Sequence, residues 1–377
     1  MPAEAPRIGL VNKFWGRDRG GVEAVLAAEA LALQRCGFRV SVLACRPLGS
    51  ATRPAPPGVS VRELGAPVVA SMPVSARFAA ALARLSHHSD GLHFHLPFPL
   101  AEAAALCLHK RGPWVATLHA EVVGRPAWMR FCQRQITERC LARMDLILVS
   151  SAPSSRCAAL GSWRQRVRVV PFGFDLRPFL QAGQQRRQQS EPVVVFLGRL
   201  VPYKGVDVLL RAAVNVPARF HILGDGRERS RLQRLAQELG VASRVRFFGH
   251  LPEDELPLRL AEGDIFVLPS RSAAETFGVA QVEAMAAGLP VVNTALATGT
   301  DWVSAHGETG LTVPPENPAA LAGALRHLLE DRPFRLACGM RARQRAHELF
   351  DIEARGPEMG ALFRELLPGR ARAAAVR

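Results

Sequence analysis

The sequence contains little lysine, few aromatic residues and no long apolar run. Only three of its 48 basic residues are lysines, and aromatic residues make up 6% of the chain. A membrane-spanning helix needs an apolar run of about 18 residues, and since none occurs we expect no such helix. The aromatic residues do not alternate with glycine as they do in RNA-binding modules, so we expect no nucleic acid partner.

The sequence also lacks the usual patterns of metal and thiol chemistry. Its seven cysteines include no Cys-x-x-Cys pair and are typical of reduced thiols in a cytosolic protein. No Asp-x-Asp motif occurs, which fits chemistry without a metal ion. We therefore expect no metal site and no bound cofactor. Because Arg7 to Val11 reads as the first strand of a fold and not as a signal peptide, we expect a cytoplasmic protein.

Basic charge is concentrated in the first half of the chain. Residues 1–190 hold 25 Lys and Arg against 11 Asp and Glu, a balance of +14. Residues 191–377 hold 23 against 22, a balance of +1. This asymmetry indicates an anionic partner for the first half, such as an anionic membrane surface or an anionic acceptor.

Strand and helix patterns alternate along the chain, which predicts an α/β fold. A chain of 377 residues that is 48% hydrophobic can bury two cores, so two domains are expected. We place the first domain at 1–175 and the second at 191–356, joined by a polar, glutamine-rich linker at 176–190 that has no apolar face. Residues 357–377 are expected to form a helix that returns to the first domain, followed by a basic tail.

The segment from Gly263 to Pro290 carries the clearest functional signal. The apolar run at 265–268 predicts a short buried strand, and the apolar spacing that begins at Val279 predicts a helix. Gly288 and Pro290 end that helix in the order expected of a C-terminal stop. The segment is therefore expected to form a strand, a polar loop and a helix.

Two glutamates with seven residues between them flank the start of this helix. Glu275 lies in the loop ahead of it, near the free N–H groups of Phe277, Gly278 and Val279, which can hold an anion. Glu283 lies about two turns further on, roughly 12 Å along the helix axis. The pair fits the two ends of an extended anionic ligand. The alternative is a surface loop and a helix with an outward glutamate.

Three glycine-bearing turns follow apolar strands in the second half of the chain. Residues 193–213 and 220–240 each read as strand, glycine turn and helix, and residues 245–256 repeat the pattern. Such turns at the carboxyl ends of strands form the mouth of a doubly wound parallel sheet, where ligands bind. The turn residues expected at this mouth are Gly198, Arg199, Lys204, Gly224, Gly226, His250 and Leu251.

These residues together resemble a known enzyme family. The pattern consists, in order, of Gly198-Arg199, Lys204-Gly205, Gly224-x-Gly226, Asp264 and Glu275-x7-Glu283. It is similar to that of the retaining GT-B glycosyltransferases with a Glu-x7-Glu signature, known as glycosyltransferase family 4, and the resemblance covers nearly the whole chain. It implies two facing Rossmann-like domains with a cleft between them. It also implies transfer of a sugar, without a metal ion, from a nucleotide diphosphate sugar on the second domain to an acceptor on the first.

The resemblance assigns roles to the residues of the second domain. Glu275 would bind sugar hydroxyls near the anomeric carbon, and Glu283 would bind the ribose hydroxyls. Arg199, Lys204 and the helix N-terminus at Phe277–Val279 would stabilise the charge that develops on the departing diphosphate.

The resemblance also assigns roles to three residues of the first domain. Gly20 and Gly21 would approach the donor diphosphate or sugar, and His119, at the end of a strand expected at 114–122, would lie beside the transferred sugar. From the residues alone, a Gly-Gly pair is more typical of a helix N-cap turn, and a histidine at a strand end is more often structural.

Residues 291–318 carry a finer resemblance. Many relatives have two glycines and an acidic residue where this chain has Thr298-Gly299 and Trp302. This variant is similar to the mannosyl- and rhamnosyltransferases of bacterial O-antigen and capsule assembly. It implies GDP-mannose or GDP-rhamnose as donor and a polyprenyl-diphosphate-linked glycan as acceptor. The alternatives are a same-fold enzyme with another donor, such as a UDP-sugar, and a soluble acceptor; an epimerase or phosphorylase; and a non-catalytic scaffold.

Arginine alternates with apolar residues between positions 125 and 143. One interpretation is an amphipathic helix packed on its sheet. The other is a helix at an anionic membrane surface, which would make the protein peripheral at the cytoplasmic face. The arginines concerned are Arg125, Arg130, Arg134, Arg139 and Arg143.

Overall fold

A computed structural model describes residues 4–16, 20–69, 72–119, 127–156, 158–185 and 191–367, without the side chains of residues 127, 130, 158 and 159. The chain divides into two compact units, one of Met1–Phe174 with Ile352–Arg377 and the other of Asp175–Asp351. Several expectations lie outside the described residues. They concern the end of the strand expected at 114–122, Arg125, the Arg130 side chain, Cys157, the linker residues 186–190 and the basic tail from residue 368.

The first unit is built on a seven-stranded sheet. Its strand order is β3-β2-β1-β6-β7-β8-β9, and every neighbouring pair is parallel. Parallel strands are covered on both faces, which explains why strands such as LILV at 146–149 are apolar throughout. The strands are β1 (Arg7–Phe14), β2 (Arg39–Pro47), β3 (Val59–Ala66), β6 (Gly91–Leu96), β7 (Trp114–Leu118), β8 (Leu146–Val149) and β9 (Val167–Val169), and a separate antiparallel pair is formed by β4 (Val68–Val69) and β5 (Met72–Pro73).

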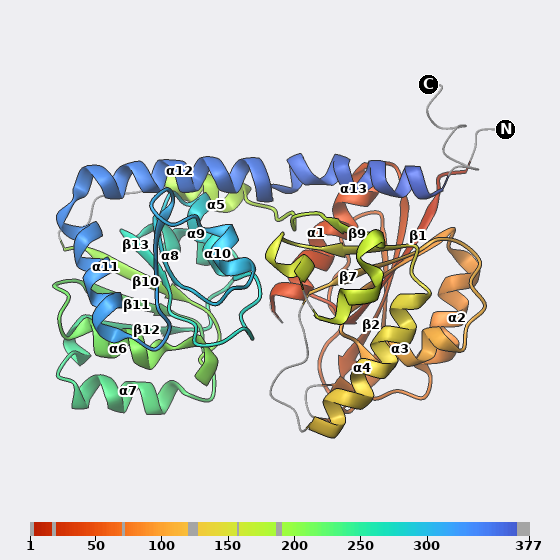
Figure 1. Ribbon diagram of the computed structural model, residues 1–377, viewed down its shortest axis with the longest axis horizontal. Coiled ribbons are helices and arrows are strands. Elements are labelled where there is room, and N and C mark those ends of the chain that lie inside the picture. The colour runs from red at the N-terminus through yellow and green to blue at the C-terminus, as the bar shows by residue number, and fades with distance from the viewer. Residues whose placement is uncertain are drawn as a thin grey trace. The chain divides into compact units, whose positions relative to one another are not determined.

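Helices cover both faces of this sheet. α1 and α13 lie side by side on one face (Figure 1), where Leu26 and Phe363 share a buried cluster with Leu10. α2, α3 and α4 cover the other face, where Phe78 and Phe98 share a buried cluster with strand residues. The helices are α1 (Gly21–Arg35), α2 (Phe78–His88), α3 (Pro99–Leu106), α4 (Ala127–Ala142), η2 (Pro153–Arg156), η3 (Ala158–Arg166) and α13 (Ile352–Leu366).

The second unit is built on a six-stranded parallel sheet. Its strand order is β12-β11-β10-β13-β14-β15. The order reverses between β10 and β13, and a doubly wound sheet binds its ligand at the carboxyl ends of the strands that flank such a reversal. The strands are β10 (Val193–Leu197), β11 (Arg219–Leu223), β12 (Val245–Gly249), β13 (Ile265–Leu268), β14 (Val291–Thr294) and β15 (Gly310–Val313).

Two groups of helices surround the second sheet. α6, α7 and α11 lie beside the strands (Figure 1), and their apolar residues form one buried cluster with them. α9 contacts β13 and β14, and it also packs against α5, α8 and α12. The helices are α5 (Arg177–Gln184), η4 (Pro202–Lys204), α6 (Val206–Ala213), α7 (Arg229–Glu238), η5 (Ala242–Arg244), α8 (Leu256–Ala261), α9 (Val279–Ala286), α10 (Gly299–Val303), α11 (Pro318–Glu330) and α12 (Arg332–Phe350).

The α/β architecture is as expected, but the stretch 176–190 differs from its prediction. It contains α5, in which Phe179 and Ala182 are buried and which packs against α8 and α9. The prediction of a linker without an apolar face is wrong over Arg177–Gln184, because residues three apart share one side of a helix and two apolar residues are enough to form its buried side.

The last helix of the described residues, α13, packs in the first unit. α13 contacts α1 and begins at Ile352, earlier than the expected start at residue 357. Among the described residues, no helix combines the length and the apolar character that crossing a bilayer requires.

Candidate active site

An ion pair between Lys204 and Glu275 lies where the strand order of the second unit reverses. Lys204 is in the loop after β10 and Glu275 is in the loop after β13. Nζ of Lys204 lies 2.5 Å from Oε2 of Glu275, and the hydroxyl of Ser270 donates a hydrogen bond to the same oxygen at 3.0 Å. Only 9% of Lys204 and 7% of Glu275 is exposed. Two residues predicted from separate motifs therefore form one buried pair.

Gly205 allows the two loops that carry this pair to touch. Its φ of 67° is in the left-handed region, and a Cβ there would lie 1.9 Å from the carbonyl oxygen of Pro269. Only glycine fits such a position. The N–H of Arg271 also donates to the carbonyl of Tyr203 at 2.8 Å, and the Arg271 guanidinium forms an ion pair with Asp207 of α6. Backbone contact and charge together hold the loops in place.

The glycine turns after β10, β11 and β12 also pack against each other. A Cβ on Gly224 would lie 2.2 Å from the carbonyl oxygen of Gly198, and one on Gly226 would lie 2.4 Å from that of Leu200. The N–H of Gly224 donates to the carbonyl of Gly249 at 2.8 Å. Three predicted glycines thus form a backbone surface at the carboxyl edge of the sheet.

Three other predicted residues do not bond to the ion pair. Arg199 is exposed in the loop after β10, and its guanidinium forms no hydrogen bond or ion pair with the other described residues. His250 is exposed and Leu251 is half-buried after β12. The exposed cation at Arg199 therefore differs from the buried, neutralised cation at Lys204 only a few residues away.

α9 begins at the position that the sequence predicts. Gly278 is its N-cap with a left-handed φ of 73°, and the buried ring of Phe277 meets that of Phe350 edge-on at 5.6 Å. The N–H groups of Val279 and Ala280, which open the helix, have no partner within it, whereas the N–H of Gln281 donates to the carbonyl of Gly278 at 2.9 Å. Glu283 is 7% exposed, so the alternative of an outward surface glutamate is wrong.

The Thr298-Gly299 variant contacts the Glu275 loop. The hydroxyl of Thr298 lies 2.9 Å from the backbone carbonyl of Glu275, to which it donates, and it also accepts from the N–H of Thr300 as the N-cap of α10. Trp302 packs edge-on against Phe350 at 5.7 Å. Thr298 therefore supports the Glu275 backbone, while Trp302 packs against another aromatic ring.

Asp264, the remaining member of the pattern, has a structural role. The N–H of Val193 donates to Oδ2 of Asp264 at 3.0 Å, and the N–H of Asp264 donates to the carbonyl of Val193 at 2.7 Å. These bonds join the amino ends of β10 and β13, at the edge of the sheet opposite to the ion pair.

His119 of the first unit is buried at the end of β7. Its Nε2 lies 2.9 Å from Nδ1 of His95, and its ring stacks on those of His95 at 5.1 Å and Phe172 at 4.9 Å. Burial holds the pKa of His119 well below its usual range. His119 is therefore a neutral imidazole at neutral pH.

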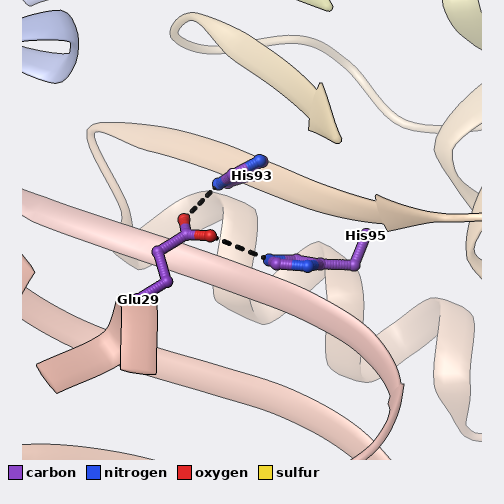
Figure 2. Close-up of side chains that lie close together, drawn as sticks. All are labelled: Glu29, His93 and His95. Atoms are coloured by element: carbon purple, nitrogen blue, oxygen red, sulfur yellow. Dashed lines mark hydrogen bonds and ion pairs between the residues drawn. The ribbon is translucent and has the colours of Figure 1, made fainter. Parts of the chain in front are cut away.

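His95 belongs to a buried cluster with Glu29 and His93 (Figure 2). Glu29 projects from α1, and its carboxylate bonds Nδ1 of His93 and lies 3.4 Å from Nε2 of His95. Nε2 of His93 lies 2.7 Å from the hydroxyl of Thr117. Burial alone would raise the pKa of Glu29, but the polar contacts with His93 and His95 hold it below its usual range. Glu29 is an ionised carboxylate.

The sequence prediction missed Glu29, His93 and His95, although a signal for them exists. In GLHFHL at 91–96 the histidines alternate with apolar residues, which puts both on one face of β6. Leu92, Phe94 and Leu96 belong to the cluster on the α2 side, so the histidines face α1. The second signal was Glu29 on the buried side of the apolar helix α1, which faces these histidines.

Gly20 and Gly21 lie at the start of α1. Gly20 is the N-cap and Gly21 is the first helical residue. Residues 17–19, just before them, lie outside the described residues. The N-cap turn predicted from the residues alone is therefore present.

α4 has a buried side and an exposed side. Thr137, Cys140 and Leu141 are buried, whereas Trp128 and Phe131 are 69% and 64% exposed. The expected packing on the sheet is confirmed for the buried side.

The described arginines of α4 and its end differ in their contacts. Arg134 pairs with Glu138 at 2.7 Å, and Arg139 is exposed. The guanidinium of Arg143 donates to three carbonyls at the end of α3 and lies 4.9 Å from the Trp114 ring. Arg143 is therefore structural, and the suggestion that it meets lipid is wrong.

Two parallel α/β units, one with a buried Lys–Glu pair at its strand reversal, define a protein of the GT-B class. A family model described as Glycosyltransferase Family 4 matches residues 19–177, and one described as Glycosyl transferases group 1 matches residues 180–345. The chain belongs to this family of glycosyltransferases.

Individual relatives agree with this assignment. The chain is 29% identical to the D-rhamnosyltransferase WbpZ of Pseudomonas aeruginosa over 71% of each chain. It is 32% identical to the GDP-mannose-dependent alpha-(1-6)-phosphatidylinositol monomannoside mannosyltransferase of Mycolicibacterium smegmatis, over 68% of this chain and 70% of that one. The solved structure of sucrose-phosphate synthase from Thermosynechococcus elongatus has a TM-score of 0.80 at 23% identity and covers 96% of this chain and 99% of its own, which shows the shared fold.

Proposed function

We propose that this protein is a retaining hexosyltransferase that moves mannose or rhamnose from a GDP-linked donor to a lipid-linked bacterial surface glycan. The observation that carries this proposal is the buried pair of Lys204 and Glu275 at the strand reversal of the second unit. Two relatives, a D-rhamnosyltransferase and a GDP-mannose-dependent phosphatidylinositol monomannoside mannosyltransferase, support the choice of donor and acceptor.

The chemistry requires stabilisation of a departing diphosphate. As the glycosidic bond breaks, negative charge grows on the leaving group, and fixed cations in a site that excludes water stabilise it. Lys204 supplies a fixed, buried cation, Arg199 adds an exposed one, and the first turn of α9 supplies N–H groups. In this proposal the reaction needs no divalent metal.

The pairing of Lys204 with Glu275 suits such a site. In the free protein each charge is neutralised by the other, which reduces the cost of burying both. A bound donor offers a phosphate to Lys204 and hydroxyl groups to Glu275. Both side chains then exchange one partner for another, and neither is left buried without a counterpart. Glu283 binds the ribose in this proposal.

We also propose that the exposed side of α4 meets an anionic membrane surface. Exposed Trp128 and Phe131, with Arg134 and Arg139 on the same helix, provide the apolar and basic groups that interfacial helices use. The net charge of residues 1–190 supports this proposal, since a lipid-linked acceptor would be reached at that surface.

A panel of nucleotide sugars tests the proposed donor. We expect transfer to a polyprenyl-diphosphate-linked glycan from GDP-mannose or GDP-rhamnose, and much slower transfer from UDP-glucose, with and without EDTA. Faster turnover with UDP-glucose would favour the alternative donor class. Failure to turn over any donor, with donor binding intact by calorimetry, would favour a non-catalytic scaffold. Loss of turnover in EDTA that added magnesium restores would contradict a metal-independent reaction.

A further inference from the structure

A path of close polar contacts leads from Glu29 on α1, through His95 on β6, to His119 after β7. All three side chains are buried, and all belong to the first unit. Oε2 of Glu29 lies 3.4 Å from Nε2 of His95, and Nδ1 of His95 lies 2.9 Å from Nε2 of His119. Figure 2 shows the first half of this path. A neutral histidine carries one proton on either of its two ring nitrogens. The nitrogen that is protonated on His95 therefore determines which nitrogen is protonated on His119.

The carboxylate decides the proton position on His95. Nε2 of His95 has no hydrogen-bond partner among the described residues, and the carboxylate of Glu29 at 3.4 Å is the charge that acts on it. A bare Nε2 would place its lone pair near this ionised oxygen, which is repulsive, whereas an Nε2–H places a positive hydrogen there. Burial lowers the pKa of His95, so the ring is neutral and carries a single proton. His95 is therefore protonated at Nε2, and its Nδ1 is an acceptor.

The acceptor on His95 in turn decides the proton position on His119. Nε2 of His119 faces the lone pair of Nδ1 of His95, so it must donate. Because His119 is also neutral, its Nδ1 has no proton. This result does not depend on the charge of His93, which bonds the other carboxylate oxygen.

We propose that Glu29 is a positioning residue that holds His119, through His95, as the Nε2–H tautomer and so keeps Nδ1 of His119 as a hydrogen-bond acceptor. The use of that acceptor, for a hydroxyl of the transferred sugar, rests on the proposed function. A hydroxyl that donates to Nδ1 would be recognised, and a substrate lacking that hydroxyl would leave the nitrogen unpaired.

The same cluster has the residue types of a metal site, but its geometry is that of a hydrogen-bonded network. Two ligands bound tetrahedrally at about 2.0–2.1 Å from zinc lie roughly 3.3 Å apart. Oε1 of Glu29 and Nδ1 of His93 are in direct hydrogen-bond contact instead, which leaves no room for an ion between them.

A cavity of about 20 Å³ lined by Glu29, Thr117 and Arg355 has room for one water molecule.

Nitrogen NMR of the histidine rings tests the tautomer directly. The full-length protein is labelled with 15N, and the His119 signals are identified by their loss in His119→Asn. We expect protonated Nε2 and bare Nδ1 at pH 7, with no change on adding zinc. A proton on Nδ1 of His119, or a zinc-dependent change in the His93 and His95 signals, would overturn the proposal.

Two variants test the role of Glu29. In Glu29→Leu the two directions of the hydrogen bond between His95 and His119 become nearly equal in energy, because the carboxylate that favours one of them is absent. The ring signals of His119 should therefore shift towards the average of both tautomers. His95→Leu breaks the path at a second point and should also change them. Glu102→Leu is the matched control, because Glu102 is equally buried but bonds Thr137 and Gln133. Unchanged His119 signals in a folded Glu29→Leu or His95→Leu protein would overturn the proposal.

Kinetics separate this inference from the proposed function. We expect Glu29→Leu to lower kcat/KM for transfer by about 10-fold or more, as for other groups that orient a functional histidine. If the tautomer changes as expected but His119→Ala transfers normally, the positioning stands and the proposed use of His119 is wrong. If His119→Ala abolishes transfer while Glu29→Leu leaves both tautomer and rate unchanged, the positioning role is wrong.

Discussion

Nζ of Lys204 lies 2.5 Å from Oε2 of Glu275, although the two residues come from different loops of the second unit. Both side chains are buried, so each supplies the counter-charge that makes burial of the other tolerable. Removal of either partner should therefore affect both stability and activity.

We expect Lys204→Ala to lower kcat/KM by about 2–4 kcal/mol of transition-state stabilisation, because the cation faces the charge that grows on the diphosphate. It should also lower the melting temperature, since Glu275 is left buried without its cation. Arg199→Ala is the matched control for stability. It should lower the rate in the same range but leave the melting temperature unchanged, because Arg199 is exposed. Wild-type kinetics in both folded variants would remove the diphosphate assignment.

Alanine substitutions of Glu275 and Glu283 should impair different steps, turnover and nucleotide binding respectively. Glu283→Ala should chiefly weaken binding of free GDP through the loss of ribose hydrogen bonds, whereas Glu275→Ala should chiefly lower kcat. Titration calorimetry with GDP and steady-state kinetics measure the two effects. Equal GDP affinity in wild type and Glu283→Ala would show that the ribose role is wrong.

Gly205→Ala should destabilise the second unit more than Gly240→Ala does. Both glycines have nearly the same left-handed φ, 67° and 68°. A Cβ at Gly205 would meet the Pro269 carbonyl oxygen at 1.9 Å, whereas one at Gly240 meets nothing within 4 Å. We expect a cost of about 1–2 kcal/mol at Gly240 from φ alone and more than about 3 kcal/mol at Gly205. Similar urea midpoints for the two variants would contradict the close approach of the loops.

Stability should fall as pH drops from 7 to about 5.5, in part because of His119. The pKa of His119 is lowered in the folded protein by burial, so below the usual value of 6.5 the unfolded chain binds more protons than the folded one. Above pH 6.5, His119 therefore does not lower the free energy of unfolding. As the pH falls towards the pKa of His119 in the folded protein, it lowers this free energy increasingly. His119→Asn should flatten the dependence of unfolding free energy on pH in this window. His88→Asn, an exposed site on α2, should not. Parallel curves for wild type and His119→Asn would contradict a buried neutral His119.

Binding to vesicles should depend on α4. Each basic residue near an anionic surface contributes about 1 kcal/mol, so Arg134→Gln with Arg139→Gln should weaken co-sedimentation with phosphatidylserine vesicles. Salt should weaken it as well. Trp128→Ser with Phe131→Ser should weaken it at every salt concentration, since these exposed rings supply the apolar contact. Arg231→Gln on α7 of the second unit is the control. Binding that ignores lipid charge, salt and the α4 variants would favour a soluble acceptor.

Local features of the second unit were predictable from the sequence. The strand at 265–268, the loop with Glu275 and the helix that begins at Val279 all have the predicted positions. Each depends on interactions between near neighbours, namely apolar periodicity, a left-handed glycine and a helix stop. α5 was missed because Phe179 and Ala182 form too small an apolar side to stand out in a polar stretch.

The sequence by itself determined the alternation of strands and helices, the glycine turns and the residues that the site draws on, because these follow from the periodicity and backbone preferences of short segments. Only the tertiary structure decided which of these residues meet. Parallel pairing of β10 with β13 brings Lys204 to Glu275, and packing of α1 on the first sheet brings Glu29 to His95. Such contacts depend on strand order and on burial, where an unpaired charge is costly, and neither is encoded in the spacing of neighbouring residues.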